Sequence, residues 1–300
     1  MELRKAVTAA VAAVLVAGAT VLMIGFRGPG PDEMAAARAV DPTPASALAP
    51  DPAPPPPEPE PREPRVRRTE SPPVPEGERR RVPVLMYHEI TQGPNNLYVA
   101  PAELEGHLRW LKENGYTAIT LKQMHRHFME GDALPEKPVV LTFDDSYLSH
   151  YTSALPLLKQ YNWPGTIFVI TGSVGQRGYM TWDQLRDAAR QGMELGAHTV
   201  SHPSLAQLSR ERLVREIAGS RQALEAETGA TVEFFCYPAG KWNELVLQTT
   251  REAGFLGAVT TRFGLADPGQ NPYRWDRVRV NKGISPVGLG RLIKLAEEGR

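Results

Sequence analysis

From residue 82 onward, short runs rich in β-branched residues alternate with segments of helical periodicity. This alternation is typical of repeated strand–helix units, in which successive strands lie parallel to one another. The pattern therefore predicts an α/β fold built on a parallel sheet. Strands are predicted at residues 82–87, 117–120, 139–143, 166–170, 194–197, 232–236, 257–260 and 277–280.

The segments between these strands have the apolar stripe of helices that pack on a sheet. Residues 102–112 place Leu104, Leu108 and Leu111 on one stripe, and residues 210–227 do the same with three aliphatic side chains. About eight strands and seven helices within residues 81–300 suit a single distorted (β/α) barrel of about seven or eight parallel strands. A doubly wound open sheet is the alternative.

The first 27 residues have the pattern of a membrane segment. Arg4 and Lys5 precede an uncharged run over residues 6–26, which is long enough to cross a hydrocarbon core as a helix. The run is longer than the apolar region of most secretory signals, which favours an uncleaved transmembrane anchor, although cleavage near residues 17–19 is the alternative. An anchor of this kind places the rest of the chain in the periplasm or cell envelope, attached to the cytoplasmic membrane.

Residues 28–80 are expected to form a disordered linker, and residues 81–300 the folded domain. Fourteen prolines lie between residues 41 and 80, among Ala, Glu and Arg. Proline removes backbone hydrogen-bond donors, and few large apolar side chains remain to offset the entropy of ordering. The segment is therefore predicted to be an extended tether.

The charge balance and the cysteine count limit the classes of function. The 34 basic and 34 acidic residues sum to a formal net charge of zero, which argues against a nucleic-acid-binding protein and favours a neutral partner. Cys236 is the single cysteine, so an intrachain disulfide is excluded. We expect a monomer.

Polar side chains that can do chemistry follow four of the predicted strands. His88 follows the first strand, and a turn at Pro238 follows the strand at 232–236; the others are Asp144, Asp145, His198 and His202. The carboxyl ends of barrel strands share one mouth, where active sites of such folds are built. We therefore expect these groups to lie together.

Two adjacent acids and two nearby histidines predict a metal centre. A helix cap would explain one of Asp144 and Asp145, whereas a cation ligand next to a free base explains both. His198 and His202 are four residues apart, and a turn can bring both rings to one ion, although a coincidental surface pair is the alternative. Two imidazoles and one carboxylate leave coordination positions open, as in catalytic rather than structural sites.

The remaining histidines and Cys236 are assigned to structure or surface. His107, His125, His127 and His150 lie in predicted helices without a matching ligand, and Cys236 ends a buried strand.

These motifs resemble the polysaccharide deacetylases of carbohydrate esterase family 4, over about residues 82–300. Residues 142–145, Thr-Phe-Asp-Asp, resemble the first family motif; residues 198–203, His-Thr-Val-Ser-His-Pro, the second; and residues 235–240, Phe-Cys-Tyr-Pro-Ala-Gly, the third. The resemblance implies that Asp145, His198 and His202 hold one divalent metal ion, usually zinc, and that Asp144 is the general base. It also implies that the backbone N–H of Ala239 stabilises the oxyanion.

The chain departs from the family pattern at three positions. Cys236 and Ala239 stand where many members have Arg and Tyr, so the base lacks its usual partner, for which Arg277 and Arg279 on the last strand are candidates. No histidine follows His202, so the usual C-terminal Leu-x-His motif is absent.

The first strand offers a replacement for the missing acid. Residues 84–89, Val-Leu-Met-Tyr-His-Glu, resemble the opening strand of biofilm poly-N-acetylglucosamine deacetylases, in which an N-terminal histidine is the acid. The resemblance implies that His88 is the general acid, with Glu89 as the alternative donor.

The resemblance implies removal of N-acetyl groups from an N-acetylglucosamine-containing polysaccharide, with an exopolysaccharide favoured by the His88 strand. Peptidoglycan, chitin oligomers and O-acetylated xylan are alternative substrates within the same family, and a non-catalytic carbohydrate-binding barrel is the alternative outside it. Tyr237, Pro238 and Trp242 are the expected substrate contacts, and Tyr98 and Trp182 also lie where rings can stack on sugars.

Overall fold

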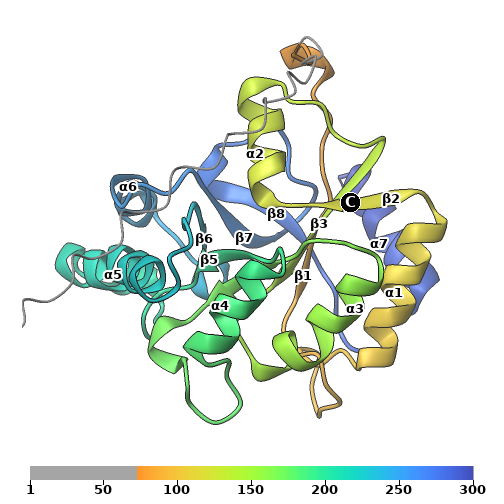
Figure 1. Cartoon of the computed structure of the whole chain (residues 1–300). Helices are drawn as coiled ribbons and strands as arrows, with labels where there is room; N and C mark the ends of the chain where they lie inside the picture. Colours follow the sequence, from red (N-terminus) through yellow and green to blue (C-terminus); the bar gives the residue numbers. More distant parts are fainter. Residues whose placement is uncertain (1–72, 300) are drawn as a thin grey trace, which may run out of the picture. The chain divides into compact units, whose positions relative to one another are not determined.

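The computed structural model describes residues 73–299, in which eight strands form one sheet with parallel pairing throughout (Figure 1). The strands are β1 (Val84–Tyr87), β2 (Tyr116–Ile119), β3 (Lys137–Phe143), β4 (Thr166–Val169), β5 (Glu194–Ala197), β6 (Phe234–Cys236), β7 (Gly257–Phe263) and β8 (Trp275–Arg279). The predicted membrane segment and most of the predicted linker lie outside the described residues.

The sheet closes into a barrel because β1 pairs with two strands. It pairs with β8 on one side and with β3 on the other, so β1 and β3 to β8 form a closed ring. The amino half of β3, Lys137–Val140, pairs with β2, while Val140–Phe143 pair with β1, which leaves β2 outside the ring. The prediction of a distorted barrel of about seven or eight parallel strands is confirmed, and the alternative of an open doubly wound sheet is wrong.

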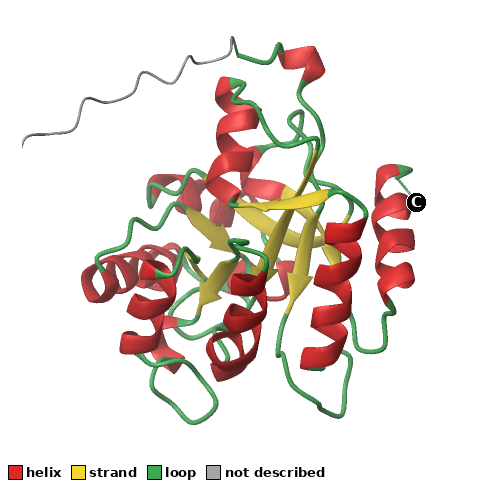
Figure 2. Cartoon of the chain, turned by 45° about the vertical axis from the view of Figure 1, so that its right-hand side comes forward, coloured by secondary structure: helices red, strands yellow, loops and turns green. Residues whose placement is uncertain are grey.

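In the described part of the chain, seven α-helices surround the strands (Figure 2). They are α1 (Pro101–Glu113), α2 (Leu121–Glu130), α3 (Leu155–Gln160), α4 (Trp182–Arg190), α5 (Arg210–Thr228), α6 (Glu244–Glu252) and α7 (Pro286–Glu297). Polar side chains at five N-caps accept backbone N–H groups that would otherwise lack partners: Thr120, Thr181, Ser209, Asn243 and Ser285. Within residues 73–299, no helix has both the length and the apolar character needed to cross a membrane.

One end of the barrel is covered by α2. Its apolar side chains Leu121, Met124 and Phe128 belong to the same buried cluster as Phe234 and Trp275. The carboxylate of Glu194, the first residue of β5, accepts hydrogen bonds from the backbone N–H groups of residues 121 and 122. Because α2 packs over the amino ends of the strands, the loops at their carboxyl ends form the open mouth.

The segment just before the first strand also contacts α2. The backbone N–H of Val74 donates to the carbonyl of Gly131 at 2.7 Å, and the guanidinium of Arg79 donates to the carbonyl of Phe128 at 2.6 Å. Residues 74–80, which the sequence analysis assigned to the linker, therefore make specific contacts with the barrel.

Candidate functional site

The groups predicted to carry chemistry lie together at the mouth of the barrel. His88 follows β1, Asp144 and Asp145 follow β3, and His198 follows β5 by one residue. His202 lies in the loop after β5, Cys236 ends β6 and Arg277 lies in β8. Side chains from five strands thus converge, as the parallel topology requires.

Asp145, His198 and His202 form a compact group of cation ligands. Oδ1 of Asp145 lies 3.3 Å from Nε2 of His198 and 3.5 Å from Nε2 of His202. One ligand atom from each of the three residues lies within 4.8 Å of the others. Asp145 and His198 are buried, whereas the side chain of His202 is 39% exposed, so the group opens toward solvent on one side.

The hydrogen bonding of His198 fits this group to a metal ion. Its Nδ1 lies 2.6 Å from the carbonyl oxygen of Cys236, an acceptor, so Nδ1 carries a proton. In the neutral ring Nε2 then bears a lone pair, which faces the carboxylate oxygen of Asp145 at 3.3 Å. Either a proton on Nε2 or a metal ion satisfies both atoms at this distance: without a metal, Cys236 and Asp145 raise the pKa of His198 despite its burial. One carboxylate with two imidazoles is also a donor set that suits a divalent ion such as zinc.

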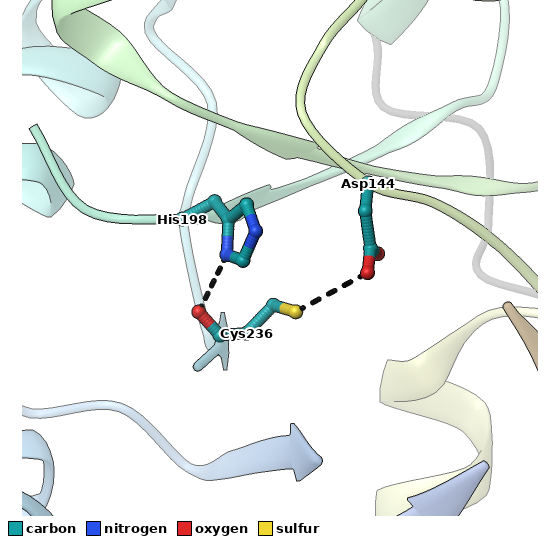
Figure 3. Close-up of side chains that lie close together, drawn as sticks. All are labelled: Asp144, His198 and Cys236. Carbon is teal, nitrogen blue, oxygen red and sulfur yellow. Dashed lines mark hydrogen bonds between the residues drawn. The ribbon is translucent and has the colours of Figure 1, made fainter. Parts of the chain in front are cut away.

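A second group of potential ligands overlaps the first but is less suitable. Asp144, His198 and Cys236 also bring one ligand atom each within 4.8 Å. Figure 3 shows Nδ1 of His198 directed at the Cys236 carbonyl and the thiol of Cys236 directed at Asp144, with Sγ 3.6 Å from Oδ2. Burial raises the pKa of the Cys236 thiol, which favours the protonated form, a poor metal ligand.

Asp144 is held by a buried arginine. Nη1 and Nη2 of Arg277 donate to Oδ1 and Oδ2 of Asp144 at 2.7 and 2.8 Å, and the Arg277 side chain is wholly buried. Burial alone would raise the pKa of Asp144, but the Arg277 charge outweighs it and holds this pKa well below its usual range. Of the two arginines considered from the sequence, Arg277 is therefore the one that contacts Asp144.

The remaining donors of Arg277 are also engaged, so its position is fixed. Nε donates to the carbonyl of Thr260 at 2.8 Å, and Nη1 donates to the hydroxyl of Thr142 at 3.0 Å. Nη2 lies 3.2 Å from Sγ of Cys236. Many family members have an arginine at the sequence position of Cys236. The small side chain of Cys236 leaves space for the guanidinium of Arg277 beside Asp144.

His88 lies beside Asp144. Its Nε2 is 4.0 Å from Oδ2 of Asp144, and its side chain is 12% exposed. Burial lowers the pKa of His88, against the opposing effect of Asp144 and Asp145, which favours the neutral ring at neutral pH. The carbonyl oxygen of His88 lies 2.6 Å from Nε2 of the buried His150, which holds this part of the backbone.

The three motif loops contain most of the non-glycine residues with left-handed backbone in the described chain. Asp145 (φ 77°), Ser146 (56°), Thr199 (69°), His202 (56°) and Ala239 (52°) account for all but one of the non-glycine residues with positive φ among residues 73–299. Each such residue costs on the order of 1–3 kcal/mol, and such strain gathers at active sites. The strained backbone of these loops therefore indicates a functional role in addition to a structural one.

The third motif forms a tight turn, and the hydrogen bonds within this turn do not involve the backbone N–H of Ala239. Gly240 donates to the carbonyl of Tyr237 at 2.8 Å and Lys241 to that of Pro238 at 3.2 Å, so these bonds do not use the N–H of Ala239.

Two of the predicted substrate contacts have buried side chains. The Tyr237 ring is fully buried and its hydroxyl donates to the carbonyl of Tyr273 at 3.1 Å, and Pro238 is also buried. Both side chains pack beneath the turn, and their role as substrate contacts stays a prediction. Trp242 is partly exposed, with the Arg274 guanidinium 5.1 Å from its ring centre.

Sequence reasoning missed one residue at the site and assigned others correctly. Burial and the nearby charge of Asp145 raise the pKa of Tyr147, and its ring stacks on that of Tyr179 with the ring centres 5.4 Å apart. Its place two residues after Asp145 is the signal that could have identified it. His107 and His150 are structural, as predicted: both are buried and both hydrogen-bond to backbone carbonyls.

The chain resembles known proteins in sequence and in structure. The family profile described as Polysaccharide deacetylase matches residues 131–258. The Bacillus subtilis (strain 168) protein YxkH, which is assigned to the polysaccharide deacetylases, is 35% identical over 214 residues, covering 71% of this chain and 76% of YxkH.

A second relative carries a more specific name. The Escherichia coli (strain K12) poly-beta-1,6-N-acetyl-D-glucosamine N-deacetylase is 27% identical over 216 residues, which span 57% of this chain and only 32% of that longer protein. Among solved structures, the Streptococcus pyogenes deacetylase PplD in complex with acetate superposes with a TM-score of 0.69 at 30% identity, covering 71% of this chain and 98% of that one.

Proposed function

Because this chain belongs to the polysaccharide deacetylase family, we propose that it hydrolyses N-acetyl groups on an N-acetylglucosamine-containing polysaccharide with one divalent metal ion, zinc by preference. The observation that supports the proposal most is the pairing of two adjacent acids with different environments. Asp145 faces two imidazoles, whereas Asp144 faces an arginine. Asp145 is thus placed to bind a cation, and Asp144 is placed to act as the base that accepts a proton.

Asp145, His198 and His202 would hold the metal ion. When bound, it supplies Lewis acidity, which makes a water molecule more acidic and polarises the acetamide carbonyl. The Cys236 carbonyl keeps the His198 proton on Nδ1, so that Nε2 stays free as a ligand. Tyr147 lies close enough to Asp145 for its charge to raise the pKa of Tyr147, and it would help to orient this carboxylate.

Asp144 accepts the proton of the attacking water. The bidentate contact with Arg277 keeps its carboxylate ionised and fixes both oxygens, so the base is ready without rearrangement. The low pKa makes Asp144 a weak base, so proton transfer to it needs a water made acidic by its surroundings.

His88 delivers a proton to the leaving nitrogen. Its Nε2 lies 4.0 Å from Oδ2 of Asp144, which puts the proton acceptor and the proton donor on one side of the site. Because burial favours the neutral ring, His88 receives the proton that Asp144 has taken from the water and passes it to the leaving nitrogen, which leaves both groups as they began. The N–H of Ala239 donates to the acetyl oxygen as negative charge develops on it.

An exopolysaccharide is the proposed substrate class. The Escherichia coli relative is named for poly-beta-1,6-N-acetyl-D-glucosamine, and the match to it covers about a third of that protein. The resemblance of residues 84–89 to the opening strand of such deacetylases supports the same class. The formal net charge of zero agrees with a neutral polymer.

The test is acetate release by the purified full chain. We expect acetate from β-1,6-linked N-acetylglucosamine oligomers, loss of release after treatment with a chelator, and recovery on adding zinc. Parallel reactions with chitin oligomers, peptidoglycan and O-acetylated xylan identify the substrate class. Binding of oligomers without acetate release, with any divalent metal, would instead support a carbohydrate-binding barrel.

A further inference from the structure

A cavity that the proposed mechanism does not use opens beside the site. It has a volume of about 540 Å³, within the range of ~300–1,000 Å³ usual for small-ligand pockets. It lies between the loop after β1 and the turn after β8, at the same mouth as the catalytic groups. Its lining residues are Thr91, Gln92, Gly93, Tyr98, Ala100, Glu103 and Lys282.

The cavity wall is built by contacts between these two loops. Lys282 donates from its backbone N–H to the carbonyl of Asn96 at 3.2 Å and from Nζ to the carbonyl of Gly93 at 2.6 Å. The carboxylate of Glu103 accepts from the N–H of Gly283 at 3.0 Å and from that of Ala100 at 2.7 Å. The wall is therefore a preformed surface rather than a loose loop.

Tyr98 is held in the wall as a flat plate. One face of its ring lies on Gly93, where an added Cβ would come within 2.1 Å of a ring carbon. The backbone of Glu89 pairs with the segment on both sides of Tyr98: its N–H donates to the carbonyl of Leu97 at 3.2 Å and its carbonyl accepts from the N–H of Val99 at 3.0 Å. The ring is partly exposed and lines the cavity, so its hydrocarbon surface is available to a ligand.

The lining has the chemistry of a sugar site. A pyranose ring has one face of C–H groups, which packs on an aromatic plate, and an edge of hydroxyls, which needs donors and acceptors. Lys282, Gln92 and Thr91 supply such groups. The charges of Lys282 and Glu103 balance, and Glu103 is already paired with two backbone amides, so a neutral sugar suits the cavity better than a charged one.

The cavity is connected to the catalytic residues through the chain. Glu89, whose backbone pairs with the segment that carries Tyr98, directly follows His88, and Lys282 lies five residues after Arg277. We propose that this cavity binds a neutral sugar unit of the polymer that flanks the unit being deacetylated, with Tyr98 as its stacking plate. The inference rests on the proposed function and adds a reason for a preference for longer chains.

The experiment compares the activity of the full-length, metal-loaded protein on long and short substrates. The ratio of kcat/KM for a pentamer of N-acetylglucosamine to that for a dimer is measured for Tyr98→Ala, Tyr98→Phe and the control Tyr161→Ala, which replaces a partly exposed aromatic at the end of α3. We expect Tyr98→Ala to lower the ratio about tenfold, which corresponds to ~1.4 kcal/mol. Tyr98→Phe keeps the ring and should keep most of the ratio, and Tyr161→Ala should leave it unchanged.

A second variant keeps the test decisive if Tyr98→Ala fails to fold. Gln92→Trp fills the cavity with a large side chain and removes none of the contacts named above, so it should lower the same ratio. An unchanged ratio in a folded Tyr98→Ala and in Gln92→Trp overturns the proposal.

A failure of the proposed function can be distinguished from a failure of the proposed sugar site. If the wild-type chain releases no acetate from any oligomer, pentamer binding is measured by calorimetry instead. Weaker binding by Tyr98→Ala than by the wild type then supports the sugar site on its own, and equal binding overturns it.

Discussion

Arg277 in β8 binds both carboxylate oxygens of Asp144 at the end of β3, at 2.7 and 2.8 Å. The two strands are not neighbours in the sheet, since β1 lies between them. The arginine therefore reaches the acid across the interior of the barrel, past the small side chain of Cys236. The arginine that many family members have at the position of Cys236 in β6 is thus replaced by Arg277 in β8.

Removing this arginine should cost both stability and activity. Arg277→Gln leaves a buried carboxylate without its charge partner, and breaking a buried pair in this way costs about 3–5 kcal/mol. Urea unfolding measures the loss. The double variant Arg277→Gln/Asp144→Asn should recover much of the stability without recovering acetate release. Equal stability of the single and double variants would show that the pair does not matter to folding.

The two adjacent acids should separate metal binding from catalysis. Asp144→Asn is expected to keep the metal and lower kcat by about 10²–10⁴-fold, because only the base is removed. His202→Ala should lose both, since a ligand is removed. Metal per mole of protein and acetate release are measured on the same samples. The matched control is His125→Ala in α2, at the far end of the barrel, which should retain metal and activity.

His88 should matter most where the leaving group needs a proton. His88→Ala is expected to keep the metal and to lower kcat for an N-acetylated sugar by about 10²–10⁴-fold. Hydrolysis of an aryl acetate should fall much less, because a phenolate departs without protonation. Equal losses on the amide and the ester would remove His88 from the role of acid.

His150 should make the fold sensitive to acid. Burial lowers its pKa from 6.5 to about 4, so the unfolded chain binds a proton between these values and the folded chain does not. Its contribution to stability is present above pH 6.5 and is lost as the pH falls toward 4, by about 3 kcal/mol in all. Urea unfolding of wild type and His150→Phe over this pH range measures it. The wild type should lose stability more steeply, and parallel curves for the two proteins would contradict the assignment.

Local sequence predicted the strands and the clustering of the site for identifiable reasons. The strand bounds of β5 agree fully with the prediction, because Glu194–Ala197 is a short run between clear breaks. The proposed metal ligands Asp145, His198 and His202 lie in the loops after β3 and β5, and parallel topology alone brings such loops to one mouth.

The choice between Arg277 and Arg279 depended on non-local register. The two residues are two apart in β8 and so share a face, which means that only their depth in the barrel distinguishes them. That depth follows from the pairing of Met86 in β1 with Arg279 and from the irregular register between β7 and β8. Neither the pairing of β1 with β8 nor the irregular register between β7 and β8 can be predicted from the residues around position 277.

The burial of Tyr237 could have been predicted, whereas the strained loops could not. Alternation along β6 puts Cys236 inside the barrel and Phe235 and Tyr237 on the helix-facing side, as their separate clusters show. The left-handed residues at positions 145, 146, 199, 202 and 239 include no glycine, so the sequence carried no signal for their conformation.

The long reach of Arg277 also bears on how the enzyme matures during synthesis. The arginine is made 133 residues after Asp144, on the strand that closes the ring against β1. A chain that ends before β8 already carries the proposed metal ligands but lacks the charge partner of Asp144. Closure of the ring and completion of the Asp144 pair therefore depend on the same strand.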